Sequence, residues 1–192
     1  MLSVVIATRE SERSLLATLT ALVSGAAAGV VREVIIADAG SRDATLSIAE
    51  EAGCRLVPVT GERGVGLKAG ADAARSPWLL FLQPGTVPDA SWVDETRLFI
   101  ELTEAANGSR RAATFRTVAM PFSPPLAEIV DLLRTSLGAR PLAKNGLLIA
   151  RSLYQDLGGH RPVEEPEAEL VRRLGRRRIA LLRSGAIVHP IA

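Results

Sequence analysis

The sequence has one cysteine, few aromatic side chains and almost no net charge. Cys54 is the only cysteine, which excludes an internal disulfide and any multi-cysteine zinc or iron-sulfur site and fits a reducing compartment. Aromatic residues make up 4% of the chain, and 23 basic against 21 acidic residues leave a formal net charge of +2. Nucleic-acid binders use aromatic stacking and a strong positive field, so we expect no nucleic-acid partner.

The sequence also lacks a long apolar run. The apolar segment 1–8 meets arginine and acid within about ten residues, so it is too short for a signal peptide or a membrane span. We therefore expect a cytoplasmic protein. One basic segment contains Arg172, Arg173, Arg176, Arg177 and Arg178. Two interpretations of it stay open: a solvated helix end, where arginine complements the helix dipole, or peripheral contact with an anionic inner membrane.

Apolar runs of strand length alternate with helical periods in the first half of the chain. The predicted strands are residues 2–7, 33–38, 55–59 and 78–82. Helices are expected from about Ser11, from near Asp43, and, after the glycine-rich stretch 60–66, through Ala74. Gly25 and Gly29 are expected to mark the exit of the first helix. This alternation predicts an α/β fold, with a mostly parallel sheet sandwiched by helices.

The second half mixes helices and strands without a linker or an internal repeat. We expect a helix over 92–106, a strand over 112–120, a helix after Pro124-Pro125, the run "GLLIA", and a closing pair of strands within "IALLRSGAIVHP". Because no low-complexity segment separates the halves, the sequence predicts one domain over residues 1–192.

In an open parallel sheet, ligands bind at the carboxyl ends of the strands. This rule selects four loops: Thr8-Arg9-Glu10, Asp38 to Asp43, Thr60 to Gly66, and Gln83-Pro84-Gly85. The Asp38 carboxylate could accept hydrogen bonds from a base or ribose, or it could serve an Asx-turn or a helix cap. The glycines of "TGERGVG" could admit phosphate to backbone N–H groups, or they could serve turns alone.

Several blocks of this sequence resemble the corresponding blocks of a known family. "SVVIATRE", "EVIIADAGSRDATLSIAEEAG", "GVGLKAGADAARSPWLLFL" and "GTVPDASWVDE" resemble the nucleotide-binding blocks of family 2 glycosyltransferases. The segment "NGLLIARSLYQDLGGHRPVEEPEAELVRRLGRRRIALL" is similar to the acceptor-side half of a bacterial subfamily associated with arsenosugar-type glycosyl transfer. The resemblance implies a GT-A-type nucleotide-diphospho-sugar transferase fold, with residues 1–90 as the nucleotide-binding half and 91–192 as the acceptor-side half.

The resemblance also implies roles for particular residues. Thr8 and Glu10 would line the nucleoside pocket, and Asp38 would contact the base or ribose. Gly66 and Lys68 would flank the sugar-diphosphate. Glu167 falls where the family places its catalytic carboxylate, normally in a Glu-Asp pair that here reads Pro166-Glu167. Glu165 is a rival for this role, and a solvated helix N-terminus is the alternative for the whole acidic segment.

The sequence departs from the family at its metal site. The family ends its fourth strand in an Asp-x-Asp-like motif that holds a divalent ion, whereas this chain reads Gln83-Pro84-Gly85. The subfamily's "Gly-Asp-Gln-Gly" block appears here as Ala143-Lys144-Asn145-Gly146. We therefore expect no metal cofactor, although Mg²⁺ or Mn²⁺ stays an option through an unorthodox site near Asp89. Gln83 is assigned to substrate binding instead.

Two interpretations follow from the missing acids. Lys68, Lys144 and His189 could supply positive charge to the departing diphosphate in place of a metal. Alternatively, the metal site has decayed, and the domain binds nucleotide sugars without catalysis or in a regulatory role. The leading prediction is inverting transfer of a sugar from a nucleotide-diphosphate donor to a hydroxyl acceptor, with Glu167 as general base. A nucleotidyltransferase is a weaker third prediction, because such enzymes ordinarily need acidic metal ligands.

Overall fold

The computed structural model describes residues 1–106, 111–118 and 145–188. The strands are β1 (Leu2–Thr8), β2 (Val31–Asp38), β3 (Arg55–Pro58), β4 (Trp78–Leu82), β5 (Thr86–Pro88), β6 (Ala112–Thr117), β7 (Leu147–Ala150) and β8 (Ile179–Val188). The helices are α1 (Glu12–Ala27), α2 (Thr45–Glu51), α3 (Arg63–Ala73), α4 (Trp92–Ala105), α6 (Arg151–Asp156) and α7 (Pro166–Leu174), with a short 3₁₀ turn η2 (Arg176–Arg178).

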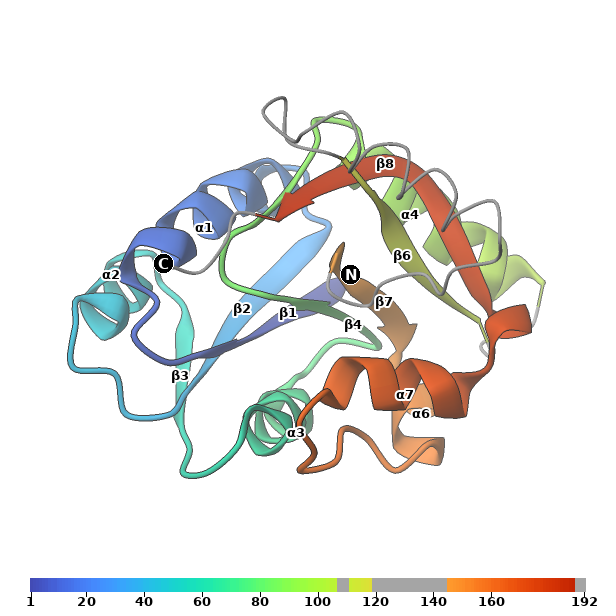
Figure 1. Ribbon diagram of the computed structural model, residues 1–192. Helices are drawn as coiled ribbons and strands as arrows, with labels where there is room; N and C mark the ends of the chain where they lie inside the picture. The colour runs from blue at the N-terminus through green and yellow to red at the C-terminus, as the bar shows by residue number, and fades with distance from the viewer. Residues whose placement is uncertain (107–110, 119–144, 189–192) are drawn as a thin grey trace, which may run out of the picture.

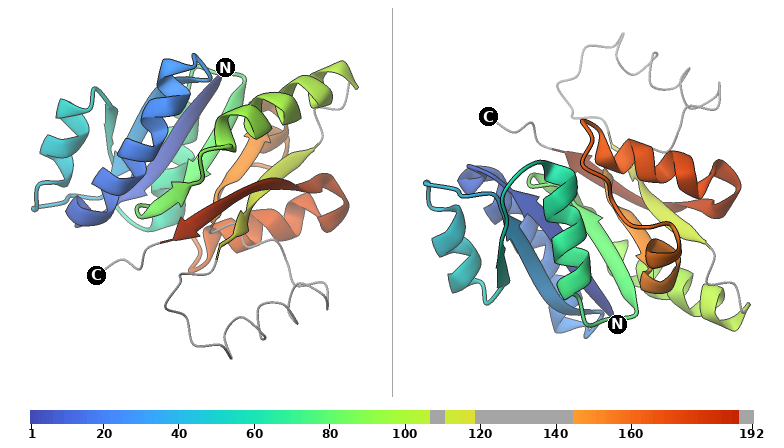
Figure 2. Two further views of the ribbon diagram at one scale, coloured as in Figure 1. Left: turned by 90° about the horizontal axis from the view of Figure 1, so that it is seen from above. Right: turned by 90° about the horizontal axis from the view of Figure 1, so that it is seen from below.

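All eight strands form one mixed sheet in the order β3-β2-β1-β4-β7-β6-β8-β5. The strands β3, β2, β1 and β4 run parallel, β6 also runs parallel to β8, and the remaining pairs are antiparallel. Helices α1 and α4 cover one face, and α3, α6 and α7 cover the other (Figure 1, Figure 2). Because both faces are covered, every residue of β1 and β4 is buried. The predicted α/β fold is confirmed.

Helix α1 continues through Gly25, where we expected it to end. A Cβ at Gly25 would lie 2.4 Å from the Trp92 ring, so this glycine lets the indole of α4 pack directly on α1. The helix ends at Ala27, and Gly29 takes the left-handed conformation with a φ of 68°. The prediction for Gly25 was wrong because the residue serves a tertiary contact, whereas Gly29 follows the helix end as expected.

The closing segment forms one long strand instead of the predicted pair. β8 pairs with β6 along its length and with β5 at its carboxyl end, so one strand serves two partners. A register shift between Thr114 and Arg116 of β6 accommodates it. The short β5 was not predicted at all. The expected helix after Pro124-Pro125, and the end of the strand expected over 112–120, lie outside the described residues.

The basic segment divides into two parts. Arg173 is largely buried, and its guanidinium donates to the Glu169 carboxylate at 2.6 Å and to the Gly159 carbonyl at 2.6 Å. Arg172 and the three arginines of η2 are exposed. Arg173 is therefore a structural residue, while contact of the others with a membrane stays a prediction. In the described part of the chain, no helix is long and apolar enough to cross a bilayer.

Candidate functional site

The loops after β1 and β2 are joined by side-chain hydrogen bonds around Asp38. One carboxylate oxygen of Asp38 accepts from Thr8 Oγ1 at 2.8 Å and Ser41 Oγ at 2.6 Å, and the other accepts from the backbone N–H groups of Gly40 and Ser41. Burial raises the pKa of Asp38, but these hydrogen bonds together lower it by more, so the net pKa lies below the ordinary value. An ionised carboxylate has about four lone-pair sites, so the protein itself already satisfies Asp38.

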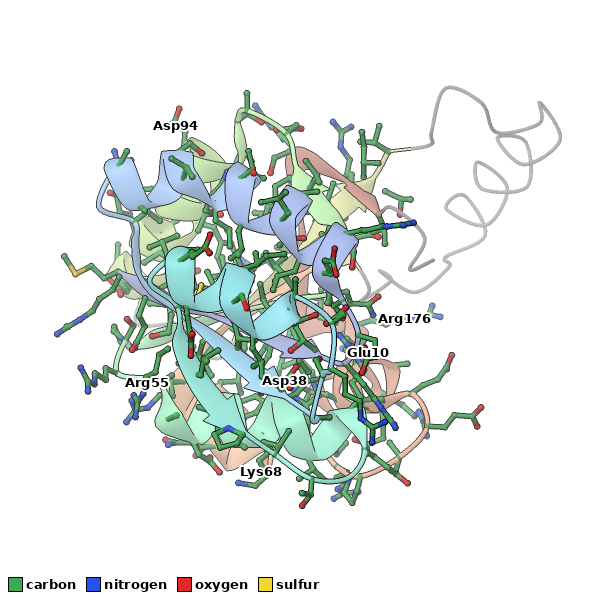
Figure 3. All side chains as sticks on the ribbon, turned by 90° about the vertical axis from the view of Figure 1, so that its left-hand side faces the viewer. Glu10, Asp38, Arg55, Lys68, Asp94 and Arg176 are labelled. Atoms are coloured by element: carbon green, nitrogen blue, oxygen red, sulfur yellow. The ribbon has the colours of Figure 1, made fainter. Side chains whose placement is uncertain are left out.

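Glu10 connects the same two loops from the other side. Its backbone N–H donates to Ser41 Oγ at 2.9 Å, and its carboxylate accepts from the Arg42 N–H at 2.9 Å. The φ of Glu10 is 49°, a left-handed conformation that a non-glycine residue adopts only when its surroundings hold it there. Figure 3 shows Glu10 and Asp38 at the same end of the sheet. The carboxyl ends of β1 and β2 thus form one preformed rim, made by Thr8, Glu10 and Asp38.

A second cluster forms where α3 and α7 begin. Arg63 Nε donates to Glu167 Oε1 at 2.7 Å, and Gln83 Nε2 approaches the same oxygen at 3.3 Å. Arg63 Nη1 also donates to the carbonyl of Ala7, in β1, at 3.2 Å. Because Gln83 directly follows β4, this cluster spans the carboxyl ends of β1 and β4 and the helix ends above them. Glu167 is therefore held at the edge of the sheet where ligands of such folds bind.

Gly64 allows the starts of α3 and α7 to approach so closely. A Cβ at this position would lie 2.0 Å from the carbonyl oxygen of Arg161 and 3.2 Å from Cβ of Pro166. Pro166 is the first residue of α7, a position that suits proline because its missing N–H has no helical partner there. The contact fixes Arg63, next to Gly64, against Glu167, next to Pro166.

The Glu167 carboxylate is buried but charged. Burial raises its pKa, whereas the charge and hydrogen bond of Arg63 lower it, and the net pKa is below the ordinary value. The side chain keeps 9% of its surface exposed. Within the described part of the chain, the other oxygen, Oε2, makes no hydrogen bond. Arg63 and Gln83 thus fix one oxygen, and no described residue holds the other.

His160 lies beneath this cluster, buried against the rings of Phe81 and Tyr154. Its backbone N–H donates to Tyr154 Oη at 3.0 Å, and this oxygen lies 3.1 Å from His160 Nδ1. Since the phenol has one proton, both contacts are satisfied when Tyr154 donates to Nδ1 and the imidazole proton sits on Nε2. Nε2 is buried and has no partner among the residues that the structure describes.

Burial lowers the pKa of His160 to about 4, and the charge of Glu167 opposes this shift only in part. The unfolded chain binds the proton near pH 6.5, so the neutral buried ring stabilises the fold fully above that pH and its contribution is lost as the pH falls toward 4. We expect about 2 kcal/mol of this loss between pH 7.5 and pH 5.

Denaturant unfolding at both pH values measures this loss. In His160→Gln the decrease should be clearly smaller than in the wild type. Parallel pH profiles for the wild type and His160→Gln would contradict the assignment.

A family model decides the classification of this fold. The model of glycosyl transferase family 2 matches residues 3–120, more than half of the chain. The chain belongs to glycosyl transferase family 2. The interpretation of the sequence blocks as those of this family is confirmed. No curated protein matches the sequence in a direct comparison.

Solved structures agree on the family 2 fold. Glucosyl-3-phosphoglycerate synthase from Mycobacterium tuberculosis, crystallised with Mn²⁺, UDP and glucosyl-3-phosphoglycerate, superposes with a TM-score of 0.71 at 19% identity, over 100% of this chain and 72% of that one. S. aureus TarS 1–349 in complex with UDP gives a TM-score of 0.69 at 17% identity, over 98% of this chain and 61% of that one. At such low identity the likeness shows the fold alone.

The structure brings together some of the residues that the family resemblance implied. Thr8, Glu10 and Asp38 meet at one rim, and Gln83 joins Glu167 at the neighbouring strand ends. The rival Glu165 is exposed, and its carbonyl accepts the Glu169 N–H within the first turn of α7. Glu167 is therefore the better candidate for the family's catalytic carboxylate.

The other predicted residues lie elsewhere or cannot be placed. Gly66 is buried inside α3, where a Cβ would make ordinary contact with Ala7 and Val59 at 3.5 and 3.6 Å. Lys68 is paired with Asp72 at 2.7 Å on the exposed side of the same helix (Figure 3). The end of the glycine-rich stretch is thus helix, in which Gly64 serves close packing, whereas Gly61 precedes the helix with a φ of 106°. Lys144 and His189 lie outside the described residues.

The described residues fit a family-type metal site poorly. The strand-four position holds the neutral amide of Gln83, which points to Glu167. Asp89, the acid considered as an unorthodox ligand, accepts from Ser91 Oγ at 2.6 Å and from the Gly185 N–H at 2.5 Å, so it stabilises the joint between β5 and α4. Glu167 already has the Arg63 cation beside it. Magnesium and manganese prefer carboxylates that are free to coordinate.

Sequence reasoning missed Arg63 and His160. Arg63 stood inside a motif examined only for its glycines, although its place just after β3 put it at the ligand-binding edge. His160 carries no motif, and only its burial beside Phe81 and Tyr154 distinguishes it.

Proposed function

We propose that this protein transfers a sugar from a nucleotide-diphosphate donor to a hydroxyl acceptor with inversion of the anomeric centre. The observation that carries the proposal is the Glu167 carboxylate, buried where β1, β4, α3 and α7 meet, with one oxygen fixed by Arg63 and Gln83 and the other held by no described residue. An oriented carboxylate of this kind suits a general base that takes the proton of an attacking hydroxyl. A single displacement with one base and no covalent intermediate gives inversion.

The rim around Asp38 is our proposed nucleoside pocket. Because four protein donors occupy the Asp38 carboxylate, we propose that it shapes the loop 39–42 and does not bind the base or ribose through a free oxygen. Thr8 acts with it, and Glu10 fixes the loop from the opposite side. The relatives crystallised with UDP make a uridine nucleotide the first donor to test.

Nucleotide binding without a required metal is the test of this function. We expect UDP to bind in buffer with chelator, because Gln83 and the Arg63–Glu167 pair occupy the place of a metal site. Calorimetry with chelator and again with excess Mn²⁺ should give affinities within about tenfold of each other, or about 1.4 kcal/mol. Nucleotide at 100 times its dissociation constant should also stabilise the fold by about 2.7 kcal/mol.

The outcomes separate the interpretations of the site. A larger gain with Mn²⁺ would mean that a metal site exists in this chain. Binding of UDP-glucose without release of UDP, across a panel of hydroxyl acceptors and water, would favour a noncatalytic binding domain. If none of the uridine, adenosine, guanosine and cytidine diphosphates binds, the proposed function is wrong. The likeness to the arsenosugar-type subfamily stays a prediction until an acceptor is found.

A further inference from the structure

Arg63 has hydrogen-bonding capacity that the protein does not use. Its Nε and Nη1 are occupied by Glu167 and by the Ala7 carbonyl. Its Nη2 is buried and lacks a hydrogen-bond partner within the described part of the chain. A guanidinium is always charged, and a buried donor without an acceptor is costly, so folded proteins rarely keep one without a use. The side chain as a whole keeps 29% of its surface exposed although Nη2 itself is covered, so a ligand reaches that nitrogen only by displacing a neighbour such as Glu167.

Arg63 also differs from the nearby cations in where its charge lies. Lys68 is exposed to solvent and pairs with Asp72 one helical turn away. Arg161 is exposed and pairs with Glu169 at 3.3 Å. Arg63 instead reaches the carboxyl end of β1 and stands beside Gln83, the residue that follows β4. The fork of an arginine matches the oxygens of a phosphate, which a lysine engages only as a point charge.

We propose that Arg63 is a direct ligand of the donor diphosphate, and that it exchanges Glu167 for phosphate oxygens when the donor binds. The inference rests on the proposed function and adds the group that receives the diphosphate charge. In the free protein Arg63 and Glu167 neutralise each other. The diphosphate then competes with Glu167 for the same guanidinium, and its binding releases the carboxylate to act as base. Donor binding therefore prepares the base for the acceptor.

The exchange predicts opposite effects for the two partners of one ion pair. Arg63→Gln should weaken binding of UDP by about 10-fold to 100-fold, the usual effect of losing a charged hydrogen bond. Glu167→Gln should tighten UDP binding by about threefold or more, because it removes the competitor for Arg63. Arg63→Lys should fall between Arg63→Gln and the wild type. Arg55→Gln is the control, since Arg55 lies at the amino end of β3, far from Glu10 in Figure 3, and should change the affinity less than about twofold.

Calorimetry with UDP and with inorganic pyrophosphate, both in chelator, measures these effects. Arg63→Gln leaves Glu167 buried without its cation and could fail to fold. The double variant Arg63→Gln/Glu167→Gln removes both charges, and its affinity relative to Glu167→Gln isolates Arg63. In the double variant the tightening should disappear.

Two results would overturn the inference while leaving the proposed function intact. One is UDP binding that is equal in Glu167→Gln and in the double variant. The other is weaker UDP binding in Glu167→Gln than in the wild type, which would mean that the pair is only a structural support. Binding of pyrophosphate but not UDP, with the same dependence on Arg63, would uphold the inference and remove the uridine donor. If neither probe binds, both proposals are wrong.

Discussion

Replacing Glu167 by glutamine should lower the rate of UDP release from a bound nucleotide sugar by about 100-fold or more, the usual range for loss of a general base. Glutamine keeps the shape of the side chain and can still contact Gln83 and Arg63, but it cannot take a proton. Among the described residues, both donors to the carboxylate hold Oε1, so the amide nitrogen of glutamine takes the place of Oε2. Steady-state kinetics with UDP-glucose, in the presence of acceptor or water, measures the effect.

Glu165→Gln is the matched control for this experiment. Glu165 lies two residues earlier on the same helix start but is exposed, so its loss should leave the rate within about twofold of the wild type. A Glu167→Gln enzyme of comparable activity would remove Glu167 from the mechanism. If Glu165→Gln proved to be the inactive variant, the base would have been assigned to the wrong acid.

Adding one methyl group at Gly64 should both destabilise the protein and disable the site. The new Cβ would lie 2.0 Å from the backbone carbonyl oxygen of Arg161. A backbone oxygen cannot move aside by changing a side-chain rotamer, so the segment from Arg161 to Glu167 must shift. Overpacking of this kind costs about 3 kcal/mol, which for a chain of this size lowers the melting temperature by about 6 to 12 °C. Displacing Glu167 by about 1 Å should reduce turnover by about 100-fold.

Gly66→Ala provides the control on the same helix. Its Cβ would make contacts of 3.5 Å or more, and alanine favours a helix by about 1 kcal/mol over glycine. We therefore expect unchanged or higher stability and unchanged UDP affinity. Weaker UDP binding in Gly66→Ala would revive the prediction that this glycine flanks the diphosphate. A Gly64→Ala protein with wild-type melting temperature and turnover would mean that the contact between α3 and α7 is not needed.

The elements of the parallel half follow from local patterns in the sequence. The run 78–82 is wholly apolar and the run 2–7 is apolar except for Ser3, as expected for strands buried on both faces, and they form β4 and β1. The helix from Trp92 was likewise visible in its periodicity and forms α4. The ends of β6 and β8, the existence of β5 and the place of Gly25 were not predictable in this way, because strand pairing and the packing of Trp92 determine them.

The candidate site also has features that local sequence predicts and features that only tertiary packing determines. The order of the blocks and the position of strand ends were enough to select Thr8, Glu10, Asp38, Gln83 and Glu167 as residues of interest. They could not show that the Asp38 carboxylate is satisfied by Thr8 of β1 together with its own loop, because that depends on where Thr8 and Ser41 lie in space. The same limit applied to Lys68, whose partner Asp72 turned out to lie one helical turn away on an exposed face.

The sequence by itself determined the alternation of strands and helices, the family, and the residues Gln83-Pro84-Gly85 that follow β4, since each of these is read from residues close together in the chain. Only the tertiary structure decided that Arg63 and Glu167, 104 residues apart, share one hydrogen bond at the edge of the sheet. It also decided that Gly64 serves the approach of α3 to α7 and that His160 is buried neutral beside them. Burial and long-range contact set the charge and freedom of these groups, and neither is fixed by local sequence.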